Sequence, residues 1–119
     1  MILVDTSVWI DHLRARDAAL VRRLDAGEVL GHPFVLGELA LGSLRQRELV
    51  LTALGDLPQA SVATDPEVLS FVEREQLYGF GIGYVDAHLL AAARLTAGAS
   101  LWTRDRRLHE AAMRLGVAG

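Results

Sequence analysis

The 119-residue chain contains no cysteine and no lysine. Without cysteine, disulfide bonds, thiolate metal sites and cysteine nucleophiles are excluded. Without lysine, the chain cannot form a Walker-type phosphate loop. Its first apolar run ends at Asp5 and is too short for a signal peptide or a membrane span. We therefore expect a cytoplasmic protein with no membrane partner.

The rest of the composition is that of an ordinary globular domain. Hydrophobic residues make up 51% of the chain, which is enough for a core and argues against disorder. We expect a single domain over residues 1–119. The net charge of −3 gives no general attraction to nucleic acid, although all 12 basic residues are arginine and stand in small clusters. A guanidinium suits phosphate, but surface arginines more often only solvate a helix face.

Short apolar runs alternate with helical patterns along the chain. Strands are expected at residues 1–4, 28–31, 60–63 and 99–103, with 117–118 as a stub of a last strand. Helices are expected to start at Thr6 or Ser7, Asp17, Pro33, Arg45, Thr64, Tyr84 and Asp105, and the helix from Thr64 should reach about Tyr78. Strands that alternate with helices predict an α/β architecture with a parallel sheet.

Four acidic residues stand in otherwise apolar surroundings. Asp5 and Asp105 follow predicted strands, at the carboxyl ends where parallel sheets bind ligands. Glu38 and Asp86 lie within predicted helices on faces whose other residues are apolar, so we expect both to point inward. A buried carboxylate is costly unless it is paired, protonated or bound to a metal ion.

Each acid also has a structural explanation. Asp5 suits a turn, Asp86 suits a helix N-terminus and Asp105 suits a helix cap, whereas Glu38 lies mid-helix and is hardest to explain. The joint pattern favours a cation site, because clustered carboxylates repel one another unless protons or a divalent ion neutralise them. Oxygen ligands alone point to Mg²⁺ or Mn²⁺. The histidines are scattered along the sequence and suggest no metal cluster.

These acids lie in four segments, which are Val4–Trp9, His32–Leu39, Gly81–Leu90 and Leu101–Asp105. In order and spacing the segments resemble the PIN-domain ribonucleases, and specifically the VapC-type toxins of bacterial toxin–antitoxin pairs. The resemblance covers nearly the whole chain. It implies an α/β/α sandwich with a small parallel sheet of four or five strands, although Val117 and Ala118 leave little for the last one.

The resemblance also implies a function. Asp5, Glu38, Asp86 and Asp105 would form the catalytic set of a ribonuclease that depends on Mg²⁺ or Mn²⁺, with Thr6 and Thr103 supporting the acids. It implies a homodimer and inhibition by a cognate antitoxin whose tail covers the site. Under this hypothesis Asp5, Asp86 and Asp105 bind the metal, and Glu38 orients or deprotonates the attacking water or binds a second ion. The candidate contacts to the RNA backbone are Arg104, Arg106 and Arg107.

Two other classes use similar parts. Receiver domains and haloacid-dehalogenase-type phosphatases also place aspartates at strand ends around Mg²⁺, but both typically need a lysine near the phosphoryl group. The second alternative is a catalytically silent module that only binds a partner, and four intact acids argue against it. The sequence does not identify the RNA that is cut.

Overall fold

A computed structural model describes all residues from Met1 to Gly119 and contains a three-stranded parallel sheet. The strands are β1 (Ile2–Val4), β2 (Val29–Leu30) and β3 (Ser100–Trp102), in the order β2-β1-β3. Every residue of β1 is buried, as expected for a central strand covered on both faces. The expected alternation of strands and helices is therefore confirmed. The sheet has three strands and not the four or five expected.

A single bridge extends the sheet at each edge. Gly31 pairs with Gln59 beyond β2, and Leu101 pairs with Ala118 beyond β3. The second bridge is the expected stub at residues 117–118. The strand expected at residues 60–63 was wrong, because the chain leaves the sheet after this bridge and the Ser61 backbone N–H donates to Thr96 Oγ1 instead.

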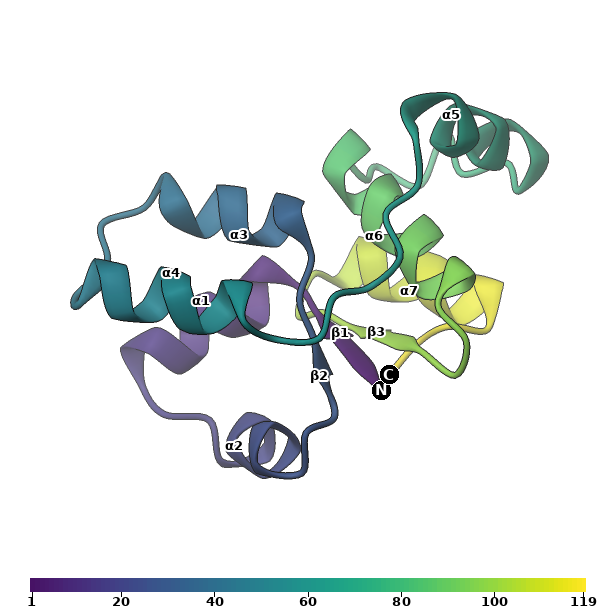
Figure 1. Ribbon diagram of the computed structural model, residues 1–119. Coiled ribbons are helices and arrows are strands. Elements are labelled where there is room, and N and C mark those ends of the chain that lie inside the picture. The colour runs from purple at the N-terminus through teal and green to yellow at the C-terminus, as the bar shows by residue number, and fades with distance from the viewer.

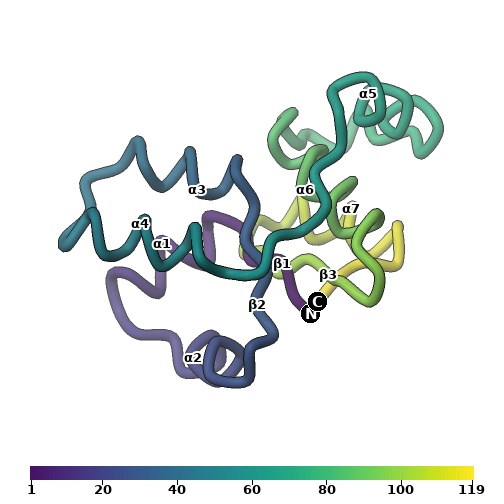
Figure 2. Tube along the Cα trace, in the orientation of Figure 1, coloured from purple at the N-terminus to yellow at the C-terminus, as the bar shows by residue number.

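Seven helices surround the sheet. They are α1 (Thr6–Arg14), α2 (Ala18–Asp25), α3 (Pro33–Ala40), α4 (Arg47–Gly55), α5 (Asp65–Arg74), α6 (Tyr84–Leu95) and α7 (Arg106–Leu115). In Figure 1, α1 to α4 lie to the left of the strands and α5 to α7 to the right, which is the α/β/α arrangement. The tube in Figure 2 shows the two chain ends side by side near the sheet. No helix has both the length and the apolar character needed to cross a membrane.

The helix boundaries follow local capping chemistry. Asp5, rather than Thr6 or Ser7, is the N-cap of α1, since its carboxylate accepts from the Ser7 backbone N–H. The capping box of Thr64 and Glu67 is present at the start of α5. That helix ends at Arg74 and not at Tyr78, because Gln76 takes a left-handed backbone conformation with φ 52°.

One hydrophobic cluster of 27 buried residues joins the sheet to its helices. Helix α6 contributes most of one side, with every residue from Ala87 to Ala93 buried. On the sheet side, Leu3 and Leu101 are fully buried. This packing fixes α6 against β3 and so holds the start of α6, where Asp86 lies, near the carboxyl ends of the strands.

Candidate active site

Asp5 is the most firmly held of the four acids. It follows β1 directly and is 6% exposed. Its Oδ2 accepts hydrogen bonds from Ser7 Oγ at 2.7 Å and from Thr103 Oγ1 at 2.8 Å. Two hydroxyl donors on one oxygen stabilise the ionised carboxylate. Its other oxygen, Oδ1, accepts no hydrogen bond from the protein.

Glu38 lies at the surface and not on an inward face, which corrects the prediction from helical spacing. It lines a groove between α1 and α3 together with Ile10 and Leu13. Thr6 Oγ1 donates to Glu38 Oε1 at 2.7 Å, and Oε2 accepts no hydrogen bond from the protein. The apolar neighbours of Glu38 therefore do not bury it, and they leave one carboxylate oxygen accessible.

Asp86 lies in the first turn of α6, and Asp105 is the N-cap residue directly before α7. Asp86 is half-buried, and its Oδ2 accepts from the Gly83 backbone N–H at 3.0 Å. Asp105 is exposed and caps α7, where its Oδ1 accepts from the backbone N–H groups of Arg107 and Leu108. The structural explanation of Asp105 as a cap is thus correct, yet its Oδ2 is free, like the second oxygen of Asp86.

The other three acids all disfavour the charged form of Asp86. Burial raises the pKa of its carboxyl above the ordinary value, and the Gly83 backbone N–H partly opposes that shift. Repulsion from Asp5, Asp105 and Glu38 raises the pKa further. Because all three other acids disfavour ionised Asp86, a bound cation would offset the repulsion between these carboxylates.

The donor set fits a divalent cation by its chemistry. Each of the four acids uses one oxygen in a hydrogen bond and keeps the other free, and none of them forms an ion pair with an arginine. Free carboxylate oxygens suit Mg²⁺ and Mn²⁺. However, no three histidine, aspartate or glutamate side chains lie close enough together to hold an ion as they stand. Metal binding therefore requires these side chains to move closer.

Comparison with known proteins shows the family of the chain. The PIN domain family matches residues 2–113. The chain belongs to the PIN domain family. It is 56% identical over 118 residues to Ribonuclease VapC32 of Mycobacterium tuberculosis in two strains, CDC 1551 / Oshkosh and ATCC 25618 / H37Rv. In each case the alignment covers 99% of this chain and 95% of the relative. The resemblance seen in the sequence is confirmed, and the receiver and dehalogenase alternatives are set aside.

The three arginines next to the acids of this PIN domain differ in the ion pairs that they form. Arg104 forms ion pairs with both Asp11 and Asp17. Arg106 is 91% exposed at the side chain and pairs with Glu110 at 3.6 Å on the same helix. Arg107 forms no ion pair and packs against Gly81. Their roles in RNA binding stay predictions, and Arg104 has the fewest free donors of the three.

Two features of the PIN domain were not foreseen. Ser7 joins the site by donating to Asp5, and the Asp-x-Ser spacing at a strand end is a capping signal that indicates it. The second is an aromatic stack in which Phe34 packs between His32 and His88, with ring centroids 5.3 and 4.5 Å away. The histidines are therefore not all scattered in space. Their separation in the sequence gave no sign of this contact.

The stack also links three helices near the acids. His88 Nε2 lies 3.0 Å from Asp65 Oδ1, and Tyr84 Oη donates to the same oxygen at 2.7 Å. His32 Nδ1 accepts from the Phe34 backbone N–H and caps α3. Burial, with repulsion from His88 as a smaller cause, lowers the pKa of His32 to about 4, so this ring is neutral near pH 7.

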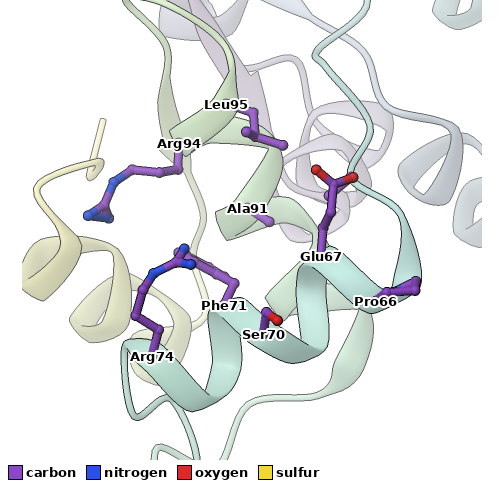
Figure 3. Close-up of a pocket in the computed structure, with 9 residues that line it drawn as sticks. Pro66, Glu67, Ser70, Phe71, Arg74, Ala91, Arg94 and Leu95 are labelled. Atoms are coloured by element: carbon purple, nitrogen blue, oxygen red, sulfur yellow. The ribbon is translucent and has the colours of Figure 1, made fainter.

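A separate pocket of about 350 Å³ lies between α5 and α6. Figure 3 shows Arg74 and Arg94 extending on one side of it and Glu67 on the other. None of the four acids lines this pocket, so it is distinct from the candidate active site.

Proposed function

We propose that this protein is the ribonuclease toxin of a VapBC-type toxin–antitoxin pair. In this proposal it hydrolyses RNA phosphodiester bonds with Mg²⁺ or Mn²⁺ held by Asp5, Asp86 and Asp105. The observation that carries it is the set of four carboxylates, each of which has one oxygen held by a hydrogen bond and one left free, while no arginine forms an ion pair with any of them. The 56% identity to a protein named a ribonuclease supports the reaction.

The bound ion would lower the pKa of a water molecule and stabilise negative charge on the phosphate. The side chains around it have separate tasks. Ser7 and Thr103 hold Asp5 Oδ2 from one side, which directs the free Oδ1 away from those donors. The backbone N–H of Gly83 orients Asp86 in the same way. These fixed hydrogen bonds reduce the reorganisation needed when the ion binds.

Glu38 is proposed to orient the attacking water and to accept its proton. Thr6 fixes Oε1 of this carboxylate, so Oε2 is the oxygen that is available to the water. Arg106 and Arg107 are proposed to contact the RNA backbone, because both lie in the first turn of α7, directly after Asp105. A guanidinium that is not fully paired within the protein can bind a phosphate.

Cleavage of RNA by the purified protein tests this proposal. The protein is incubated with total RNA in Mg²⁺, Mn²⁺ or EDTA beside the Asp5→Asn variant, whose amide can still accept from Ser7 and Thr103. We expect cleavage only by the parent protein and only with metal. Equal cleavage by both proteins would disprove the assigned site, and no cleavage with any metal would favour the catalytically silent module.

Partners and location complete the proposal. We propose a homodimer, a cognate VapB-type antitoxin that inhibits the enzyme, and a cytoplasmic location. Size-exclusion chromatography with light scattering tests the dimer. Mapping the cleaved ends in total RNA after induced expression would identify the substrate.

A further inference from the structure

The side chain of Arg104 joins the turn after β3 to the helices α1 and α2. Its Nη1 donates to Asp11 Oδ2 of α1 at 2.6 Å, and its Nη2 donates to Asp17 Oδ2. Asp17 is itself fixed, because it caps α2 by accepting from the Leu20 backbone N–H at 3.0 Å. The guanidinium also lies 6.0 Å from the ring of Trp102. Arg104 therefore bridges α1, α2 and β3.

The backbone of Arg104 is fixed by the candidate site. Its N–H donates to Ser7 Oγ at 3.0 Å, and that hydroxyl donates to Asp5 Oδ2. The residue before it, Thr103, also donates to Asp5, and the residue after it, Asp105, is one of the four acids. Movement of Arg104 would thus move Thr103 and Asp105 with it.

The local charge argues against a role for Arg104 in binding phosphate. One guanidinium pairs here with two carboxylates, so the group carries a net charge of about −1 at pH 7. To reach a phosphate, Arg104 would have to leave Asp11 and Asp17 unpaired close to the incoming RNA. The unpaired carboxylates of Asp11 and Asp17 would then repel the phosphate that Arg104 binds.

We propose that Arg104 is a positioning residue, which anchors the turn carrying Thr103 and Asp105 to α1 and α2, and that it does not contact RNA. Only the expected effects on RNA cleavage rest on the proposed function, whereas the anchoring of the turn does not. The ion pairs are partly exposed, with side-chain exposures of 38% for Arg104 and 18% for Asp17, so their main effect is on geometry and not on global stability. Small displacements of groups that support metal ligands typically cost about 10–100-fold in activity or metal affinity.

The test compares Arg104→Gln, Asp17→Asn and the double variant. Arg23→Gln is the matched control, because Arg23, in the last turn of α2, forms an exposed ion pair with Glu28 and none with the acids of the site. For cleavage of a short RNA, we expect kcat to fall about tenfold in both single variants, with KM and its salt dependence unchanged. The double variant should be no worse than Arg104→Gln alone, because loss of the guanidinium already breaks the ion pair with Asp17. Arg104→Lys should not restore kcat, because an ammonium lacks the fork that reaches both carboxylates.

Two readouts do not depend on cleavage. Mn²⁺ affinity, measured by calorimetry without RNA, should weaken about tenfold in both single variants and remain unchanged in Arg23→Gln. Amide hydrogen exchange of the metal-free protein should accelerate at residues 103–108 in both variants and not elsewhere. Unchanged exchange at residues 103–108 would overturn the anchoring role, whether or not the protein cuts RNA.

A phosphate contact would give a different result. Arg104→Gln would then raise KM and reduce the slope of binding against salt by about one unit. Asp17→Asn would leave RNA binding unchanged or strengthen it, because the arginine would be freed. That pair of results would overturn the proposal, whereas absence of cleavage by the parent protein would count against the proposed function alone.

Discussion

The hydroxyl of Thr103 offers a direct test of how the site is held together. It donates to Asp5 Oδ2 at 2.8 Å and accepts from the Asp105 backbone N–H at 3.1 Å. Thr103 is 7% exposed and Asp5 is 6% exposed, so water cannot easily replace either bond. Thr103→Val keeps the shape of the side chain and removes only the hydroxyl.

The expected loss follows from these two bonds. A hydrogen bond to a charged group contributes about 1.5–3 kcal/mol, and a neutral one about 1 kcal/mol, so the variant should lose about 2–4 kcal/mol. For a domain of this size, at roughly 4 °C per kcal/mol, the melting temperature should fall by roughly 8–16 °C. The measurement is thermal and urea unfolding of the metal-free protein in EDTA, followed by circular dichroism.

Two controls make the result decisive. Thr103→Ser keeps the hydroxyl and should lose no more than about 1 kcal/mol, the value of one buried methyl group. Thr52→Val removes an exposed hydroxyl of α4 and should change stability by less than about 0.5 kcal/mol. If Thr103→Val also stays within about 0.5 kcal/mol of the parent, the hydroxyl does not satisfy the Asp5 carboxylate and the reasoning fails.

Three further predictions follow from the same structure. Since the pKa of Asp86 is raised in the folded protein, its contribution to stability is present below the ordinary value of 3.8 and lost as pH rises through the folded value. Asp86→Asn, without RNA or metal, should therefore gain melting temperature over the parent as pH rises from 3.8 through the folded pKa and keep that gain at higher pH, and an equal gap on both sides of this transition would contradict this. The pKa of His32 is lowered to about 4, so its ring should show no NMR titration between pH 5 and 8, and its contribution to stability should be lost as pH falls from about 6.5 to 4. Gly81 has φ +77°, and an added Cβ would lie 2.8 Å from Arg107 Nη1, so Gly81→Ala should cost about 1–2 kcal/mol. The control Gly37→Ala meets no atom within 4 Å in mid-helix and should instead gain about 0.5–1 kcal/mol in urea unfolding.

The order of elements and the four segments carrying acids could be read from the sequence because they depend on local chemistry. Apolar runs, caps and helix-breaking glycines act over a few residues, and this is the range that sequence patterns report. Asp5 at a strand end and Asp105 at a helix start were placed correctly for this reason. The capping box at Thr64 is another instance.

The predictions from sequence failed where the structure depends on contacts between distant parts of the chain. Residues 60–63 have the composition of a strand, but β2 ends at Leu30 and His32 already caps α3, so little ladder remains for them to join. Glu38 lies among apolar residues, yet α1 covers only part of α3 and leaves a groove in which the carboxylate is exposed. The ion pairs of Arg104 depend on how the turn after β3 meets α1 and α2, which no local pattern encodes.

The bond between Thr103 and Asp5 joins residues 98 positions apart, nearly the full length of the chain. At synthesis rates of about 5–20 residues per second, Asp5 is made roughly 5–20 s before the residue that holds its carboxylate. During translation, a nascent chain therefore carries the first three acids without Asp105 or the hydroxyl that orients Asp5. The acid set is complete only once Asp105 has been synthesised, 100 positions after Asp5, so the site cannot exist on a nascent chain that carries the first three acids alone.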